Sequence, residues 1–180
     1  KGNKTKRPDI VIYVNGIALG VIELKRSTVS ASEGIRQNIG NQNENYIKTF
    51  FATIQLLFAA NDTEGLYYGT TQTTEEYYLT WDRKDESFKE VNNRLDRHIS
   101  QICTKERFLE IIHDFIIFDN GIKKICRHNQ YFGIKAAQKY VKEKKGGIIW
   151  HTQGSGKSLT MVWLAKWIRE NIDDSRVVLL

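Results

Sequence analysis

Two runs of β-branched and aromatic residues, separated by Asn15-Gly16, constrain this chain more than any other feature of its sequence. The runs are DIVIYV (9–14) and IALGVIEL (17–24). Asn-Gly between such runs favours a tight β-hairpin, because both residues tolerate the positive φ angles of a two-residue turn. The sequence therefore predicts two antiparallel strands near its start.

The segments that follow predict a mixed α/β fold. Polar residues in 30–50 indicate a helix, although Gly34 and Gly40 lower its helix propensity. Residues 83–104 are charged and show no clear periodicity, so we expect a surface connection there. Apolar or aromatic runs bounded by polar turns predict three more strands, at 53–61, 65–71 and 75–82.

The second half predicts helices and then a strand, a glycine loop and a helix. Residues 105–118 place apolar side chains at helical spacing, and Asp119-Asn120-Gly121 predicts a turn after them. Residues 130–143 predict another amphipathic helix. GIIW (147–150) predicts a short strand that leads into a glycine loop and a helix at 157–171, which is how a parallel α/β domain begins.

Composition limits the classes of protein that the chain can belong to. Its 180 residues, 41% of them hydrophobic, suffice for one packed domain and a piece of a second, and the net charge of +6 favours a phosphate-bearing partner. Cys103 and Cys126 are isolated and predict free thiols in a reducing cytoplasm. No run is apolar enough for a membrane span. Because Lys1 leads directly into a strand and the apolar run SRVVLL (175–180) predicts an unfinished buried strand, we expect a fragment of a larger protein.

Charged residues on the two hairpin strands suggest a metal site. Glu23 and Lys25 lie two residues apart, so their side chains share one face of the strand. A regular two-residue loop would set Asp9 opposite Ile22 and turn it away from Glu23. A three-residue loop or a bulge would shift the pairing by one residue and bring Asp9 onto the face of Glu23. A metal site therefore requires an odd-numbered loop or a bulge in this hairpin.

If Asp9 and Glu23 meet, their carboxylates suit a hard divalent ion such as Mg²⁺. Such an ion lowers the pKa of water and stabilises charge on a reacting phosphate. Lys25 beside it could orient or deprotonate the attacking water, or stabilise developing negative charge. The alternative interpretation of the same residues is a solvated strand edge.

Asp9, preceded by Pro8, and the later Glu23-Leu24-Lys25 together resemble the PD-(D/E)xK nuclease motif. The whole stretch 7–25 resembles the nuclease region in the R (restriction and motor) subunit of type I restriction enzymes. Ala18-Leu19 departs from that family, which usually has Pro-Leu there, and the family's usual N-terminal helix is missing.

This resemblance implies a restriction-endonuclease-like mixed sheet flanked by helices. It also implies that Asp9 and Glu23 hold Mg²⁺, that the carbonyl of Leu24 assists, and that Lys25 is catalytic.

The same family carries a QxxxY motif on the helix after the ELK triplet, and two positions here compete for it. Gln42 and Tyr46 fit the letters, whereas Gln37 fits the distance from Lys25 better but has Asn41 in place of the tyrosine. We favour Gln37, with ordinary polar helix residues as the alternative. Two nearby basic side chains are candidate contacts for DNA phosphates, with a solvated charged face as the alternative: Arg36 and Lys48.

HTQGSGKS (151–158) fits the phosphate-loop pattern except that His151 replaces the first glycine. Lys157 would reach the β- and γ-phosphates of a nucleotide, and the Ser158 hydroxyl would reach Mg²⁺. The candidate nucleotide-binding residues of this loop are Gly154, Ser155, Gly156, Lys157 and Ser158.

TQGSGKS resembles motif I of superfamily 2 helicases, and WHTQGSGKS resembles the type I R subunit closely, which implies the truncated start of a RecA-like P-loop domain. Arg127 and Gln130 in CRHNQY resemble the Q motif that reads adenine in such motors, although a polar helix cap is the alternative. The second acidic motif that ATP hydrolysis requires does not occur in the chain. We therefore expect ATP binding without hydrolysis by this stretch alone.

Taken together, the resemblance implies a nuclease domain at 1–104, a helical connection at 105–145 and the start of a helicase or translocase domain at 146–180. It implies Mg²⁺-dependent hydrolysis of double-stranded DNA, coupled in the whole enzyme to ATP-driven translocation. The expected partners are specificity and methyltransferase subunits in a bacterial or archaeal cytoplasm, and no membrane. Two alternatives remain: an ATP-dependent helicase or remodeller with a non-catalytic DNA-binding module, and a non-enzymatic domain with a decayed nuclease fold.

Overall fold

The computed structural model describes residues 5–81 and 91–178 and has a mixed α/β fold. A five-stranded sheet in the order β1-β2-β3-β4-β5 is antiparallel except between β2 and β3, and a separate hairpin pairs β6 with β7. The strands are β1 (Ile10–Val14), β2 (Ile17–Leu24), β3 (Leu56–Asn61), β4 (Gly65–Gly69), β5 (Leu79–Thr80), β6 (Ile116–Asp119) and β7 (Ile122–Ile125).

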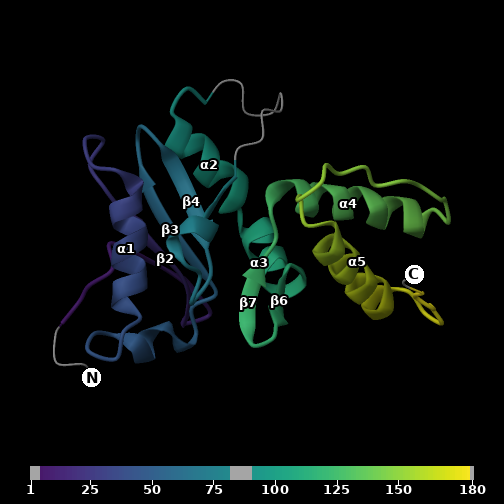
Figure 1. The fold of residues 1–180 in the computed structure, drawn as a ribbon, viewed down its shortest axis with the longest axis horizontal. Helices are drawn as coiled ribbons and strands as arrows, with labels where there is room; N and C mark the ends of the chain where they lie inside the picture. The colour runs from purple at the N-terminus through teal and green to yellow at the C-terminus, as the bar shows by residue number, and fades with distance from the viewer. Residues whose placement is uncertain (1–4, 82–90, 179–180) are drawn as a thin grey trace.

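Five α-helices and two short 3₁₀ segments accompany these strands in the described parts of the chain. The α-helices are α1 (Ala31–Asn41), α2 (Arg94–Ile102), α3 (Lys105–Asp114), α4 (His128–Lys142) and α5 (Lys157–Asn171), and the 3₁₀ segments are η1 (Lys48–Ala52) and η2 (Glu75–Tyr77). Figure 1 shows the sheet with α1 at one end of the molecule, α4 and α5 at the other, and α3 with the β6–β7 hairpin between them. No helix in the described ranges is long and apolar enough to cross a membrane.

The first hairpin has a two-residue turn and a bulge. Asn15 and Gly16 form the turn with φ angles of 49° and 81°. Tyr13 pairs with Ala18 but Ile12 pairs with Gly20, so Leu19 is the extra residue on β2. The prediction that a metal site requires a bulge or an odd loop here is met by the bulge, which shifts the register by one residue.

Two apolar layers cover the sheet. On one face, α1 and η1 pack on a small core that includes Val21, Ile35 and Leu57. On the other face, a larger core joins the sheet to the helices that follow it, and it includes Phe58 of β3 and Trp163 of α5. Because β2 contributes alternate residues to the two layers, Val21 faces α1 and Ile22 faces the larger core.

Residues 83–104, expected as a surface connection, contain helix α2; residues 82–90 lie outside the described residues. The Asn93 side chain caps α2 by accepting from the backbone N–H groups of Leu95 and Asp96. His98 and Ile102 of this helix are fully buried against the sheet. Arg94 and Asp96 of α2 are exposed and Arg97 is partly buried, so charged residues stand next to buried ones along this short helix.

The helix expected at 105–118 ends at Asp114, because its last apolar residues form strand β6 instead. The turn predicted at 119–121 is present, with Asn120 and Gly121 at φ angles of 49° and 80°. It joins β6 to β7, a strand that was not predicted from the sequence. The helices expected at 130–143 and 157–171 are present as α4 and α5.

Three expected strands are shorter than predicted or absent. The run 53–61 becomes extended only at Leu56, and within 75–81 only Leu79–Thr80 form a strand, after the 3₁₀ segment η2. Residues 147–150 form no strand, and Ile148 and Trp150 are 91% and 87% exposed. A strand needs a hydrogen-bonding neighbour, and no strand among the described residues pairs with this segment.

Candidate functional site

Asp9 and Glu23 come together at the open end of the first hairpin. The register of β1 and β2, continued by one residue, sets Asp9 opposite Glu23. Asp9 Oδ2 accepts a hydrogen bond of 2.8 Å from the backbone N–H of Leu24, which fixes the carboxylate beside β2. Glu23 has no exposed surface, whereas Asp9 is exposed. The hairpin therefore presents one buried and one accessible carboxylate at the same place.

The pKa of Glu23 is raised to about 7. Burial of the side chain is the main cause, and the negative charge of Asp9 adds to it, while the positive charges of Lys25 and Lys6 act in the opposite direction. A second negative charge on this pair is costly unless a cation lies nearby.

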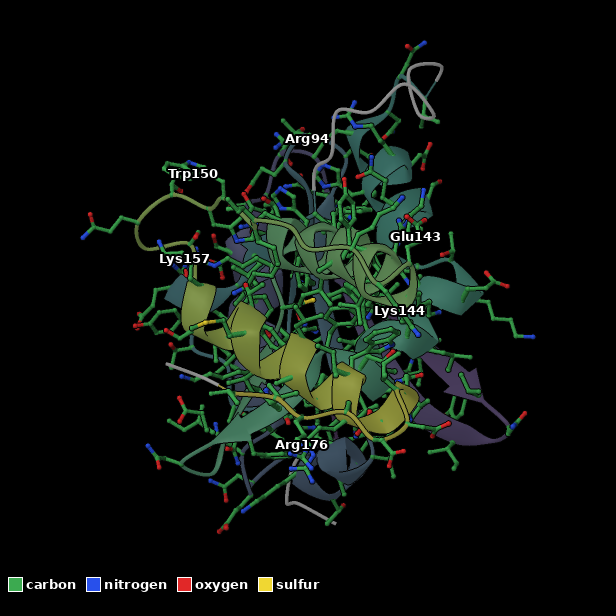
Figure 2. The ribbon with its side chains drawn as sticks, turned by 90° about the vertical axis from the view of Figure 1, so that its right-hand side faces the viewer. Arg94, Glu143, Lys144, Trp150, Lys157 and Arg176 are labelled. Atoms are coloured by element: carbon green, nitrogen blue, oxygen red, sulfur yellow. The ribbon has the colours of Figure 1, made fainter. Side chains whose placement is uncertain are left out.

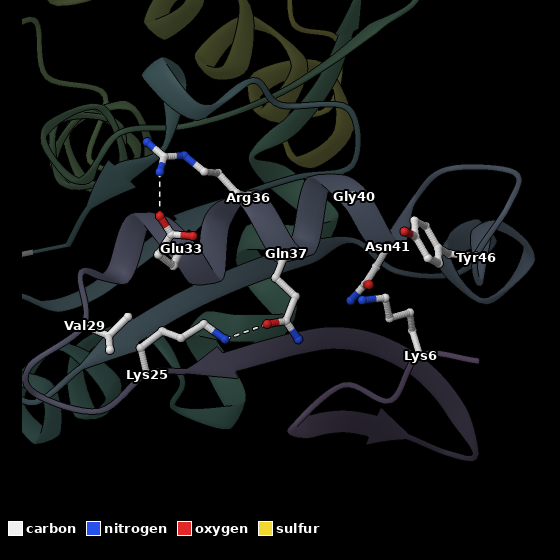
Figure 3. Close-up of a pocket in the computed structure, with 9 residues that line it drawn as sticks. All are labelled: Lys6, Lys25, Val29, Glu33, Arg36, Gln37, Gly40, Asn41 and Tyr46. Atoms are coloured by element: carbon white, nitrogen blue, oxygen red, sulfur yellow. Dashed lines mark hydrogen bonds and ion pairs between the residues drawn. The ribbon is translucent and has the colours of Figure 1, made fainter. Parts of the chain in front are cut away.

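Helix α1 supplies two amide side chains to Glu23. Gln37 Nε2 donates to Glu23 Oε2 at 2.7 Å, and Asn41 Nδ2 donates to Glu23 Oε1 at 3.4 Å. The Gln37 amide also accepts from Lys25 Nζ at 2.6 Å, shown in Figure 3. Gln37 and Asn41 are four residues apart and so share one face of the helix. Gln37 thus bridges Glu23 and Lys25 and holds both side chains in position.

Gly34 allows α1 to lie this close to the sheet. A Cβ atom there would lie 3.1 Å from Ala59 Cβ and 3.4 Å from the carbonyl oxygen of Glu23. The glycine that weakened the helix prediction is therefore a packing requirement. Asn38, on the same face, donates to the carbonyl of Phe58 at 2.9 Å and anchors the helix to β3.

A cavity of about 560 Å³ opens in front of these residues, between α1 and the N-terminal segment. In Figure 3, Lys25 and Val29 lie at one end, Gln37 in the middle, and Asn41, Lys6 and Tyr46 at the other end. Glu23 is buried behind the two amides. Sequence reasoning missed Lys6 and the contact of Asn41 with Glu23, since the first lies outside the motif and the second was considered only as a replacement for tyrosine.

The competing candidates from the sequence lie in different surroundings. The Gln42 side chain bonds the carbonyl of Asn38 and the N–H of Gln72, away from Glu23. Tyr46 does line the cavity. Two basic residues are engaged by carboxylates: Arg36 by Glu33 and Glu75, and Lys48 by Glu44.

The site offers oxygen atoms, which a hard cation prefers as ligands, but it offers few of them. Asp9 and Glu23 offer carboxylate oxygens, which Mg²⁺ prefers, and Asp9 is bonded to the backbone N–H of Leu24, the residue whose carbonyl is the third expected ligand. Within the described residues, no group of three or more His, Cys, Asp or Glu side chains is placed to hold a metal ion. Mg²⁺ usually keeps several waters, so two carboxylates and a carbonyl fit it.

The glycine loop before α5 forms a second candidate site. Gly154 and Gly156 have φ angles of 76° and 82°, and Gly156 is the N-cap of α5. Lys157 Nζ donates to the carbonyls of Thr152 and His151 at 3.1 and 3.4 Å. Figure 2 shows Lys157 at the start of α5. The lysine lies within its own loop, as a phosphate-binding side chain of such a loop must.

The remaining loop residues differ in exposure. Ser155 is buried and its hydroxyl donates to the carbonyl of Thr152 at 2.7 Å, whereas Ser158 is exposed in the first turn of α5. Trp150, upstream of the loop, projects into solvent in Figure 2.

Gln130 on α4 touches this loop. Its Nε2 donates to the carbonyl of Gly156 at 2.8 Å, and its Oε1 accepts from the backbone N–H of Arg127 at 2.8 Å. Any side chain at Gly156 would collide with Gln130, since a Cβ atom would lie 2.4 Å from Nε2. Arg127 is the exposed N-cap of α4. The structure therefore joins Gln130, and through it Arg127, to the glycine loop.

Comparison with protein families gives two matches on this chain. The model described as type I restriction enzyme R protein N terminus matches residues 1–76, which hold the carboxylate pair and α1. The model described as SWI2/SNF2 ATPase matches residues 129–180, which hold the glycine loop and α5.

The similar proteins are named as endonuclease subunits of type I restriction enzymes. The HindI type I restriction enzyme endonuclease subunit of Haemophilus influenzae is 29% identical over 187 residues, covering 92% of this chain and 17% of its own length. The SsaAORF53P endonuclease subunit of Staphylococcus saprophyticus is 27% identical over 179 residues, covering 97% and 19%. A protein of Methanocaldococcus jannaschii, also named for a type I restriction enzyme endonuclease subunit, is 33% identical over 191 residues, covering 93% and 17%. The chain spans less than a fifth of the length of these curated relatives.

Proposed function

Residues 1–76 belong to the N-terminal region of the type I restriction enzyme R proteins and residues 129–180 to the start of a SWI2/SNF2 ATPase region, and from this organisation we propose that the chain is the DNA-cleaving end of an R subunit. Its reaction is the hydrolysis of phosphodiester bonds in double-stranded DNA. The observation that carries the proposal is the network in which Gln37 joins Glu23, opposite Asp9, to Lys25.

In this proposal, Asp9, Glu23 and the carbonyl of Leu24 hold Mg²⁺. When bound, Mg²⁺ supplies a water of lowered pKa and neutralises charge on the phosphate. The N–H of Leu24 keeps Asp9 in place, and Gln37 and Asn41 orient the buried Glu23. The ammonium of Lys25, held by Gln37, is free to donate further hydrogen bonds to a phosphate oxygen or to orient the attacking water.

The same proposal assigns a fold and boundaries to each domain of the chain. Residues 1–104 form a restriction-endonuclease-like domain, 105–145 a helical connection and 146–180 the start of a RecA-like domain. In the second site Gly154, Ser155, Gly156 and Lys157 surround the nucleotide phosphates, Ser158 contacts the accompanying Mg²⁺, and Gln130 with Arg127 reads adenine. The contact of Gln130 with the loop at Gly156 supports this assignment.

In the whole enzyme, ATP-driven translocation precedes cleavage, and specificity and methyltransferase subunits select the DNA. The relatives are named endonuclease subunits of type I restriction enzymes, which supports assembly with further subunits.

Cleavage of plasmid DNA by the R protein that carries this sequence, assembled with its partner subunits, tests the proposal. We expect cleavage that requires Mg²⁺ and ATP, and that falls at least a hundredfold in Lys25→Ala, as when a group that stabilises the transition state is removed. Lys124→Ala is the matched control, because Lys124 pairs with Asp119 on the β6–β7 hairpin and does not line the cavity. Cleavage that persists in Lys25→Ala would remove the catalytic assignment, and ATP-driven translocation without any cleavage would favour a helicase with a non-catalytic module.

A further inference from the structure

Lys6 is a basic residue at the candidate site that the nuclease motif does not include. It lies in the segment before β1, and its side chain lines the cavity beside Asn41 and Tyr46. Its ammonium lies 5.0 Å from the centroid of the Tyr46 ring, a cation–π distance that holds the side chain while leaving it charged. The charge of Lys6 also acts on Glu23, where it opposes the rise in pKa.

The cavity extends along α1 with one lysine at each end. Its α1 lining runs from Glu33 to Asn41, and these two positions lie about 12 Å apart along the helix at about 1.5 Å per residue. Lys25 lies at the Val29 end and Lys6 at the Asn41 end in Figure 3. A DNA strand carries a phosphate roughly every 3.4 Å of helix axis, so a groove of this length meets more than one phosphate of a strand.

The other cations that line the cavity are engaged. Arg36 is bound by Glu75 through two hydrogen bonds of 2.8 and 2.9 Å and by Glu33 at 2.6 Å. Lys25 is bonded to Gln37 in the proposed catalytic network. Within residues 5–81 and 91–178, no carboxylate is placed in an ion pair with the Lys6 ammonium.

We propose that Lys6 is a second phosphate-binding residue of this site, which holds the DNA phosphate next to the scissile one at the end of the cavity opposite Lys25. This inference rests on the proposed nuclease function. Tyr46 acts as a positioning residue, because its ring holds the Lys6 ammonium in place by a cation–π contact in the absence of DNA.

Salt dependence of DNA binding tests the inference on the 180-residue chain. Binding of a short mixed-sequence duplex is measured by fluorescence anisotropy at several NaCl concentrations, with Ca²⁺, another hard divalent ion, in place of Mg²⁺. Loss of one phosphate contact lowers the slope of log affinity against log salt by about 0.9. We expect that fall and a severalfold weaker affinity in Lys6→Ala and a retained slope in Lys6→Arg. The control Lys124→Ala, outside the cavity, should keep the slope unchanged, with equal thermal midpoints for all variants.

The outcomes separate the two proposals. An unchanged slope in Lys6→Ala would overturn the role of Lys6. It would leave the nuclease proposal standing if the wild-type chain binds DNA and the assembled R protein cleaves it with Mg²⁺ and ATP. Equal losses in Lys6→Ala and Lys124→Ala would also overturn the role of Lys6, because they would reflect net charge alone. A wild-type chain that does not bind DNA, together with an assembled R protein that does not cleave DNA with Mg²⁺ and ATP, would overturn the nuclease proposal and this inference with it.

Discussion

Glu23 is a fully buried carboxylate that faces a second carboxylate, and its protonation should govern how the metal-free chain responds to pH. Its pKa is about 7 in the folded protein, against an ordinary value of 4.5. The folded state therefore binds this proton more tightly than the unfolded state does. The stabilising effect is fully present below pH 4.5 and is lost as the pH rises to about 7.

We predict that the free energy of unfolding in EDTA falls by about 3 kcal/mol between pH 4.5 and pH 8 through this residue. Glu23→Gln should remove that component, because the amide keeps the shape of the side chain without a titrating group. Urea denaturation of both proteins across this pH range measures the difference. Parallel pH profiles for the two proteins would contradict the assigned cause.

Gln37 is the side chain that connects the carboxylate pair with the lysine, so its loss should affect function more than stability. We predict that Gln37→Ala lowers Mg²⁺-dependent cleavage about 10- to 100-fold, as is typical when a group that orients metal ligands is removed. Gln42→Ala serves as the control, because its amide bonds only Asn38 and Gln72 among the described contacts. A larger loss of cleavage in Gln42→Ala would assign the QxxxY role to the other glutamine.

Helix α1 and strand β2 are the elements that build the site, and their separation depends on Gly34. We predict that Gly34→Ala costs about 1–3 kcal/mol of stability, because its Cβ would press on Ala59 and on the backbone of Glu23. Gly40→Ala on the same helix meets nothing within 4 Å and should stabilise the protein by about 0.5–1 kcal/mol. Thermal or urea unfolding distinguishes the two, and equal effects would mean that the helix packs differently from this structure.

Local sequence signals predicted most of these elements, and tertiary context explains the errors. The Asn15-Gly16 turn follows from backbone preference alone and helix α4 from its periodicity, whereas α5 was predicted as the helix that follows the glycine loop. The bulge at Leu19 does not follow from the local sequence, because the register of the two strands depends on which residues the sheet buries. Apolar runs were ambiguous for the same reason: Ile116–Phe118 fits a helix or a strand until the Asn120-Gly121 turn supplies a partner strand.

The candidate site was predictable where a side chain is defined by its spacing. Glu23 and Lys25 share a strand face by simple alternation. Asn41 and Lys6 could not be placed in the same way, since their positions depend on how α1 packs on the sheet and on the path of the N-terminal segment.

At the scale of the whole molecule, one large core joins the sheet to the helices beyond it. Trp81 lies at its centre, with the rings of Tyr68 and Tyr131 at 5.7 and 5.3 Å and the guanidinium of Arg107 at 5.8 Å. The β-sheet region and the region of α4 and α5 are therefore packed together through shared side chains.

We predict that Trp81→Ala lowers the free energy of unfolding by about 3–5 kcal/mol, the usual cost of deleting a buried aromatic side chain. Because the core is shared, urea transitions followed by circular dichroism and by tryptophan fluorescence should coincide in the wild-type chain. Two separate transitions, with only one of them shifted by the substitution, would show that the two regions fold independently.

The central claim is that Asp9 and Glu23 together hold one divalent cation. Titration of the chain with Mn²⁺, followed by calorimetry, tests it most directly, with Asp9→Asn and Glu23→Gln as variants and Glu44→Gln as the control on the exposed surface. We predict one site in the wild-type chain, at least tenfold weaker binding in each of the two variants, and no change in the control. Equal Mn²⁺ affinity in the wild-type chain and in Glu23→Gln would contradict the account.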